Sequence, residues 1–307
     1  MTADTPLIQL EGVSKHFGPV KANQDISLAF RAGRIKSLLG ENGAGKSTLM
    51  SILAGRLQPD SGRILVDGRR ETFRSAQDAI AAGIGMVYQH FMLVEAMTVT
   101  ENIFLGYPGP LLINPARMEA RVAELARQVR LTIDPRAKVA DLSMGEKQRV
   151  EILKLLFRQN RILIFDEPTA VLTPQECEQL FEALRQLAAQ GKAIVFISHK
   201  LDEVMALSDE IAVLHKGAVV ADMAADRVQS KAELAQLMVG REVILQVARK
   251  HLDTRQRVLN IAGLADDDLK DIHLELRQGE ILGLVGVAGN GQKPLVETIC
   301  GLKRPGK

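Results

Sequence analysis

Short runs of mainly apolar residues recur along the chain and predict buried strands. Three clear examples are Ile35–Leu39 (IKSLL), Ile162–Phe165 (ILIF) and Ala193–Ile197 (AIVFI). None of the three alternates strictly between apolar and polar positions, so we expect each strand to be covered on both faces, as in a parallel sheet that lies between helices.

Apolar residues at helical spacing fill the stretches between these runs. Asn114 and Pro115 fit an N-cap and a first helical position. The apolar positions that follow them are Met118, Val122, Leu125 and Val129. Thr173 and Glu176 fit a capping box at the start of a later helix, which we expect Gly191 to close.

The alternation of strands with helices predicts an α/β fold with a mainly parallel sheet. A largely helical stretch from about residue 98 to residue 158 interrupts the alternation. We expect a first domain over 1–240, a linker over 241–257 and an incomplete second domain over 258–307. The basic cluster Arg249, Lys250 and His251 is interpreted as part of a solvated linker.

An internal repeat supports the second domain. When the sequence is aligned with itself so that Ile26 lies on Ile272, residues match without a gap to the end of the chain. The matched pairs include Leu28/Leu274, Arg31/Arg277, Gly33/Gly279, Ile35/Ile281, Gly40/Gly286, Gly43/Gly289, Gly45/Gly291, Leu49/Leu295 and Gly55/Gly301. The second domain is therefore expected to begin as a copy of the first, with a strand, a loop and a helix.

A glycine-rich loop follows the first apolar run. Residues 40–48 read GENGAGKST, which matches G-x-x-x-x-G-K-[ST] between a strand and a helix. Such a loop points backbone N–H groups at phosphate oxygens beside a helix N-terminus, so we favour phosphate binding over a plain glycine turn. We expect Lys46 to reach the β- and γ-phosphates and Ser47 to bind Mg²⁺. The predicted nucleotide-binding residues of this loop are Gly40, Glu41, Asn42, Gly43, Ala44, Gly45, Lys46, Ser47 and Thr48.

An acidic pair follows the run ILIF. Alone, Asp166 and Glu167 would be more typical of a turn or a helix start, but beside a phosphate-binding loop they predict a hydrolytic site. Asp166 can hold Mg²⁺ directly or through water. Glu167 can orient or deprotonate the attacking water.

Composition limits the function classes further. The net charge of +2 comes without a stripe of Lys and Arg, so we expect no nucleic-acid partner. Cys177 and Cys300 are too few for a disulfide framework, which favours a reducing compartment, and Cys177 is expected to serve packing. No signal peptide and no apolar run of about 18 residues is present, so any membrane association is expected to be peripheral.

Residues Leu142–Arg149 read LSMGEKQR, precede a predicted helix and lie upstream of Asp166. This stretch resembles the signature motif of the ABC transporter ATPases. The resemblance implies that Ser143 and Gly145 bind the γ-phosphate of a nucleotide held by another cassette. The signature residues are Ser143, Met144, Gly145 and Glu146.

Three further positions fit the same family. Gln89 (VYQH) resembles the glutamine that contacts Mg²⁺ and senses a transmembrane partner, and His199 (FISHK) resembles the switch histidine near the γ-phosphate. Phe17 (KHFGPV) lies where the family places an aromatic ring on adenine, and we favour stacking over core packing. The resemblance implies a P-loop cassette with a parallel core sheet, an antiparallel β subdomain and a helical signature subdomain. It also implies Lys46, Glu167 and His199 as catalytic residues.

The stretches Gly83–Gly106 and Ile162–Glu176 resemble the double-cassette ATPases of simple-sugar and nucleoside uptake, and HFMLV is closer to the nucleoside branch. The resemblance implies ATP and Mg²⁺ as cofactors. It implies transmembrane permease subunits as direct partners and an extracytoplasmic solute-binding lipoprotein as an indirect one. The expected location is the cytoplasmic face of the cell membrane.

Two departures from the family pattern affect the expected chemistry. The second loop reads GVAGNGQKP, so Gln292 aligns with Lys46, and Lys293 takes the place of a metal-binding hydroxyl. We expect no hydrolysis at this degenerate loop, which comprises Gly286, Gly291, Gln292 and Lys293. Residues 170–173 (AVLT) also lack the aspartate that couples the two sites in many relatives.

No second signature motif follows the degenerate loop. The ATP site at Lys46 is therefore expected to need either the remainder of a longer protein or a second copy of the chain. The leading hypothesis is an importer subunit that hydrolyses ATP. The alternatives are a fragment or regulatory docking subunit that binds ATP without hydrolysis, and a soluble tandem-cassette factor that acts on ribosomes or DNA.

Overall fold

The computed structural model describes residues 6–89, 91–107, 114–129, 131–240, 256–286 and 290–304. The chain divides into two compact units, Met1–Val243 and Ile244–Lys307. Almost all of the predicted linker, residues 241–255, lies outside the described residues.

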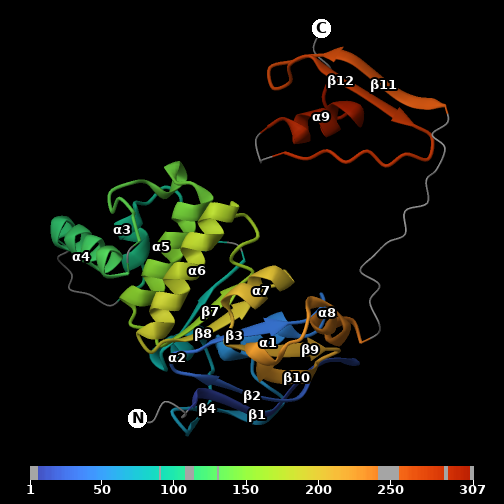
Figure 1. Ribbon diagram of the computed structural model, residues 1–307. Coiled ribbons are helices and arrows are strands. Elements are labelled where there is room, and N and C mark those ends of the chain that lie inside the picture. Colours follow the sequence, from blue (N-terminus) through green and yellow to red (C-terminus); the bar gives the residue numbers. More distant parts are fainter. Residues whose placement is uncertain are drawn as a thin grey trace. The chain divides into compact units, whose positions relative to one another are not determined.

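A six-stranded sheet forms the centre of the first unit, in the order β10-β9-β3-β8-β7-β6 (Figure 1). Its strands are β3 (Ile35–Leu39), β6 (Ile84–Val87), β7 (Ile162–Asp166), β8 (Ala193–Ile197), β9 (Glu210–His215) and β10 (Ala218–Ala224). All neighbours are parallel except β9 and β10, which pair antiparallel. The mainly parallel sheet predicted from the apolar runs is confirmed.

A charged side chain nevertheless lies in the central strand. Lys36 of β3 is only 2% exposed. Its ammonium lies 3.0 Å from the carboxylate of Glu210 and 2.8 Å from that of Asp222. Because a buried charge is tolerated only when it is paired, this pairing explains how IKSLL can be a fully buried strand despite its lysine.

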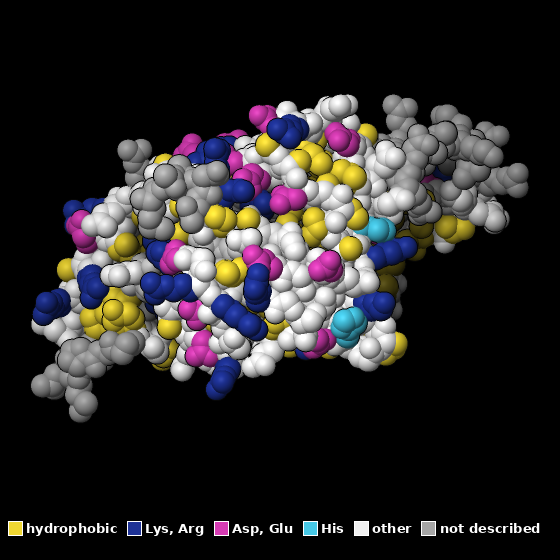
Figure 2. Space-filling view, turned by 90° about the horizontal axis from the view of Figure 1, so that it is seen from below, with side chains coloured by type: hydrophobic (Ala, Val, Ile, Leu, Met, Phe, Trp, Pro, Cys, Tyr) yellow, Lys and Arg dark blue, Asp and Glu magenta, His cyan; other side chains and the backbone are white. Residues whose placement is uncertain are grey.

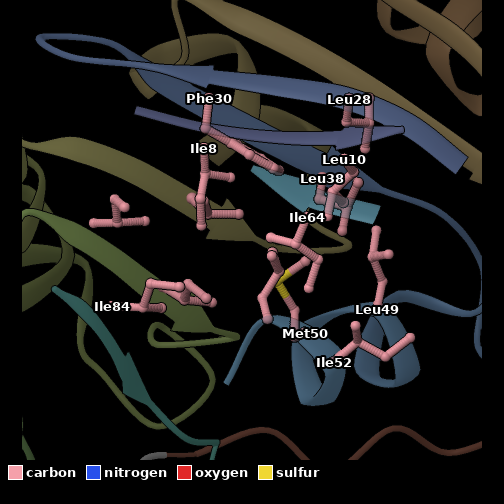
Figure 3. Close-up of a cluster of buried hydrophobic side chains, with 14 of the residues drawn as sticks. Ile8, Leu10, Leu28, Phe30, Leu38, Leu49, Met50, Ile52, Ile64 and Ile84 are labelled. Carbon is pink, nitrogen blue, oxygen red and sulfur yellow. The ribbon is translucent and has the colours of Figure 1, made fainter. Parts of the chain in front are cut away.

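A second, antiparallel sheet has the order β2-β1-β4-β5. Its strands are β1 (Pro6–Phe17), β2 (Val20–Arg31), β4 (Ser61–Val66) and β5 (Arg69–Glu71). The helix α1 (Lys46–Leu53) contributes to the same apolar core as both sheets. Figure 3 shows Leu49 and Met50 of α1 in one apolar cluster with Leu10, Leu28 and Ile64 of the antiparallel sheet.

Helices cover the rest of the central sheet. They are α2 (Ala76–Ala81), α3 (Val99–Phe104), α4 (Pro115–Gln128), α5 (Met144–Phe157), α6 (Pro174–Ala189), α7 (Leu201–Leu207) and α8 (Lys231–Val239), with 3₁₀ turns at Val139–Asp141 and Ala225–Arg227. Asn114 caps α4 and Thr173 caps α6 with Glu176, as predicted. α6 ends at Ala189, and the left-handed Gly191 follows one residue after its C-cap.

The helices α3, α4 and α5 gather at one end of the first unit (Figure 1). None of the described helices combines the length and the apolar composition needed to cross a bilayer. On the face shown in Figure 2, Lys and Arg side chains are interspersed with Asp and Glu.

The second unit contains β11 (Arg257–Leu264), β12 (Ile272–Arg277) and α9 (Gln292–Ile299). Its hairpin reproduces the register of β1 and β2. The pairs Arg257↔Arg277, Leu259↔Leu276, Asn260↔Glu275, Ile261↔Leu274 and Leu264↔Ile272 correspond to Pro6↔Arg31, Ile8↔Phe30, Gln9↔Ala29, Leu10↔Leu28 and Val13↔Ile26. The repeat seen in the sequence is therefore also a structural repeat.

One part of the predicted copy does not form. Residues 281–285 repeat β3 but are not a strand, and Ile281 and Val285 are each 98% exposed. β3 obtains its ladder hydrogen bonds from β8 and β9. The described part of the second unit contains no counterparts of those two strands, so the repeated strand has no partner there.

The core position of α1 can be tested with Leu49→Ala. Because Leu49 is fully buried, we expect a loss of about 2–5 kcal/mol in the free energy of unfolding of the first unit. Denaturant titration followed by circular dichroism measures this loss. Leu105→Ala makes the same chemical change at a side chain that is 44% exposed and should cost no more than about 0.5 kcal/mol. Equal losses at the two positions would contradict the packing described.

Candidate functional site

A cavity of about 1140 Å³ opens in the first unit where several parallel strands end. β3 leads into the glycine-rich loop, β6 is followed by Gln89, β7 ends at Asp166, and β8 is followed by His199. The cavity is lined by Phe17, Val20, Lys21, Ala22, Gly40, Glu41, Asn42, Gly43, Gly45, Lys46, Ser47, Thr48, Gln89, Asp166, Glu167, His199, Lys216 and Met238. Parallel strands place their carboxyl ends at one edge, which is why segments far apart in sequence meet here.

The glycine-rich loop owes its path to two close approaches of the backbone. Gly45 has φ +101° and is the N-cap of α1, and a Cβ there would collide with the carbonyl oxygen of Ala22. A Cβ on Gly40 would lie 2.5 Å from the carbonyl oxygen of Leu214. Only glycine fits these positions, and the tight turn leaves the first N–H groups of α1 beside the cavity, where they favour an anion.

Lys46 begins α1 and is 7% exposed. Its ammonium donates to the carbonyl oxygens of Gly40 at 2.6 Å and Glu41 at 2.9 Å. Burial lowers the pKa of Lys46, while the charges of Glu167 and Asp166 oppose that shift. A phosphate in the loop would add negative charge beside the ammonium and would therefore favour its protonated form.

Glu167 and His199 form a pair at the wall of the cavity. Glu167 has φ +47°, a strained conformation for this residue, and its N–H donates to the carbonyl oxygen of Ile197 at 3.0 Å. Its carboxylate lies 3.0 Å from Nδ1 of His199. At this place the carboxylate of Glu167 can accept a proton from a water molecule, and the imidazole of His199 can donate a hydrogen bond to a phosphate oxygen.

A metal site for Mg²⁺ would draw on three oxygen donors that line this cavity. Ser47 supplies a hydroxyl, Gln89 an amide carbonyl and Asp166 a carboxylate, which are ligand types that Mg²⁺ prefers. Burial and the neighbouring Glu167 raise the pKa of Asp166, and Lys46 opposes this. Because only one of the three donors is charged, the set fits a Mg²⁺ that also binds phosphate oxygens.

The end of the cavity near Phe17 is apolar and basic. The Phe17 side chain is 47% exposed, so its ring is available to a ligand, and the ammonium of Lys15 lies 5.8 Å from the ring centre. Lys216 and Met238 also line the cavity, and no motif in the sequence marks either residue. They come from the β9–β10 turn and from α8. That turn reaches the cavity because the N–H of Gly217 donates to the carbonyl oxygen of Ala44 at 3.1 Å.

A further residue that sequence reasoning missed is Asn23, which is fully buried behind the loop. Its side-chain amide donates to the carbonyl oxygen of Gly45 at 3.1 Å. The pattern of β2 gave no sign of this role, because an asparagine in a strand is recognisable as a loop support only from its partner in three dimensions.

The signature residues do not line the cavity. Ser143 caps α5, its hydroxyl accepts from the N–H of Glu146, and the Glu146 carboxylate accepts from the N–H of Ser143. These hydrogen bonds lower the pKa of Glu146. Met144 is 49% exposed, whereas Gly145 is buried so tightly against Glu176 that a Cβ would overlap its carboxylate. The N-terminus of α5 is thus fixed by its own capping box and contributes no residue to the cavity that contains Lys46.

The degenerate loop shares the left-handed glycine before its helix with the first loop but lacks the lysine at the next position. Gly291 is the left-handed N-cap of α9, with φ +91°, as Gly45 is of α1. Gln292 takes the place of Lys46, and its amide nitrogen lies against Gly286. Lys293 points outward, with its side chain 86% exposed and its ammonium 3.8 Å from Glu297. Residues 287–289 lie outside the described residues.

Sequence comparison finds similarity to proteins that are named as import ATP-binding proteins. The family model described as ABC transporter matches residues 23–170. The chain is 44% identical to the nucleoside import ATP-binding protein NupA of Lactococcus lactis, with 98% of this chain and 61% of NupA covered. It is 43% identical to the guanosine import ATP-binding protein NupO of Bacillus subtilis, with 97% and 60% covered. The chain thus spans about 60% of the length of these curated relatives.

Comparison with solved structures gives the same fold. CbiO1 of Clostridium perfringens, described as part of an ABC transporter complex, aligns with a TM-score of 0.66 and 26% identity, over 76% of this chain and 94% of that one. A nucleotide-free ATP-binding cassette from an ABC transporter aligns with a TM-score of 0.67 and 24% identity, over 77% and 100%. The cassette fold predicted from the sequence is confirmed.

The steric role of Gly45 leads to a prediction for ligand binding. Gly45→Ala adds a Cβ that collides with Ala22 at a left-handed backbone, so the loop must open, and ATP affinity is expected to fall by about tenfold or more. Isothermal titration calorimetry with Mg-ATP measures the change. Gly291→Ala is the matched control, because the same substitution at the equivalent glycine of α9 should leave ATP affinity unchanged. A similar loss in both variants would refute the assignment of the ATP site to the first loop.

Proposed function

We propose that the chain belongs to the ABC transporter ATP-binding proteins, to whose family model residues 23–170 are similar, and that it binds and hydrolyses ATP to energise the import of nucleosides or simple sugars. The observation that carries the proposal is the cavity in which Lys46, Asp166, Glu167 and His199 meet beside a helix N-terminus. The solute class rests on the printed names of the relatives, which specify nucleoside, guanosine, ribose and glucose import.

Binding of ATP would use the length of the cavity. Its triphosphate would lie in the glycine-rich loop, with Lys46 on the β- and γ-phosphates, and its base would stack on Phe17. Mg²⁺, when held by Ser47, Gln89 and Asp166, would neutralise charge on the β- and γ-phosphates. The binding energy is therefore expected to come mainly from charge and backbone N–H groups, with a smaller share from the ring of Phe17.

Hydrolysis would depend on Glu167 and His199. Glu167 can orient or accept a proton from water that attacks the γ-phosphate, and the adjacent imidazole can donate a hydrogen bond to a γ-phosphate oxygen. The contact of 3.0 Å between the two side chains sets the imidazole against the carboxylate before ATP arrives. This arrangement supplies the positioning on which phosphoryl transfer mostly depends.

The ATP site at Lys46 is expected to be complete only when the N-terminus of a helix equivalent to α5, from another cassette, binds the same nucleotide. Because Ser143 and Gly145 do not line the cavity of their own chain, we propose that this surface binds the γ-phosphate of an ATP held by another cassette. That cassette would be either a second copy of this chain or the second cassette of a longer protein.

Coupling to transport requires a membrane partner. We propose that permease subunits bind the first unit at the cytoplasmic face of the membrane, and that an extracytoplasmic solute-binding lipoprotein delivers the solute to them. ATP-driven closure of two cassettes would then change the access of the solute site from one side to the other.

The requirement for pairing predicts how ATP hydrolysis depends on protein concentration. The rate per chain is expected to rise with concentration as pairs form. Glu167→Gln should lower the rate by about 100-fold or more, because it removes the general base, while ATP still binds. A coupled assay of phosphate release measures both effects. Tight ATP binding without turnover at any concentration would contradict hydrolysis by this chain and would favour the alternative of a binding-only subunit.

Phe17 is expected to bind the base rather than to fill a core. Phe17→Ala should weaken ATP binding by about 1–3 kcal/mol and leave the thermal unfolding temperature unchanged, and Phe17→Tyr should retain the affinity. Calorimetric titration and thermal unfolding separate the two roles. If Phe17→Ala instead lowers the unfolding temperature without weakening ATP binding, the ring serves packing.

A further inference from the structure

A partly buried cluster of polar side chains connects the two loops that carry Glu167 and His199. The centre of this cluster is Glu203, in the first turn of α7, whose side chain is 12% exposed. Glu203 does not line the cavity. It therefore cannot act on a nucleotide directly, and any role in hydrolysis must pass through the residues that it holds.

Both carboxylate oxygens of Glu203 have partners. One oxygen accepts from the hydroxyl of Thr169 at 2.6 Å and from the hydroxyl of Ser198 at 2.9 Å. The other lies 2.9 Å from the ammonium of Lys200. Lys200 in turn donates to the carbonyl oxygen of Thr169 at 3.1 Å, and its N–H donates to Ser198 at 3.1 Å. Hydrogen bonds of side chains and backbone in this cluster thus join the segment that follows β7 to the segment that follows β8.

These partners lie beside the candidate catalytic pair. Thr169 comes two residues after Glu167, and Ser198 immediately precedes His199. Thr169 and Ser198 are each 2% exposed, so their hydroxyls have no bulk water to replace a lost partner. Removal of the Glu203 carboxylate would leave both hydroxyls and the nearby ammonium to find new partners, which would shift the two loops relative to each other.

The position of Glu167 relative to His199 depends closely on the residues around them. Glu167 is held at φ +47°, and strained backbone of this kind persists only where the surroundings determine it fully. The contact of 3.0 Å between Glu167 and His199 joins side chains from the two segments that Glu203 connects. We infer that Glu203 is a positioning residue for ATP hydrolysis, which fixes Glu167 against His199 without touching the nucleotide. This inference rests on the proposed hydrolysis of ATP.

The first test compares Glu203→Ala with Asp202→Ala. Asp202 is the adjacent acidic residue of the same helix turn, is 80% exposed and pairs with Lys231 instead of the cluster. We expect kcat for ATP to fall by about 10–100-fold in Glu203→Ala, while the Kd for ATP changes by less than about twofold. Asp202→Ala should leave both values unchanged. A loss of ATP affinity that parallels the loss of kcat would contradict a positioning role.

Conservative variants separate positioning from folding. Thr169→Val removes one hydroxyl with little change in volume, and Thr169→Ser keeps it. The inference expects Thr169→Val to lower kcat and Thr169→Ser to restore most of it. These variants decide the question if Glu203→Ala does not fold, and equal activity of the two would overturn the inference.

A spectroscopic test does not require turnover. The ring proton resonances of His199, identified by their loss in His199→Ala, should move in Glu203→Ala and stay in place in Asp202→Ala. Resonances that do not move, together with an unchanged kcat, would overturn the role of Glu203. If the unmodified protein shows no ATP hydrolysis, the proposed function fails, yet these resonances still decide whether Glu203 positions the histidine.

Discussion

The structure depends most on the close approach of the glycine-rich loop to the strands around it. Gly45 meets the backbone of β2 at Ala22, and Gly40 meets the backbone of β9 at Leu214, so the loop can adopt its path only without Cβ atoms at these positions. The helix that follows buries Leu49 and Met50 between the two sheets (Figure 3). The apolar core thereby fixes the direction of α1, and α1 fixes the N–H groups and the lysine that face the cavity. The packing of the core and the lining of the cavity therefore depend on the same close approach of the loop.

Much of this could be predicted because the signals are local. A buried parallel strand is a short apolar run, so β3, β7 and β8 follow from the sequence, and the contiguous glycine-rich motif predicts the loop between β3 and α1. The roles of Asn23, Lys216 and Glu203 could not be predicted. Each depends on a partner that is distant in sequence or on which side of a turn faces the cavity, and one sequence contains no record of such contacts.

The second unit shows the limit of a repeat as a guide to structure. Its hairpin and its left-handed glycine before α9 reproduce those of the first unit, because strand pairing and helix capping need only local partners. The segment that repeats β3 does not form a strand, because a central strand needs neighbours on both sides. The replacement of Lys46 by Gln292 shows further that the helix start can be repeated while the charge at its first residue is lost.

The central claim is that one chain offers one competent ATP site, in the first unit. Equilibrium dialysis with radiolabelled ATP and Mg²⁺, at saturation, measures the number of nucleotides bound per chain. The account predicts one nucleotide, lost in Lys46→Met because the loop then lacks its ammonium, and retained when Gln292 and Lys293 are both replaced by alanine. Two nucleotides per chain, or binding that survives Lys46→Met and is lost with Gln292 and Lys293, would contradict it.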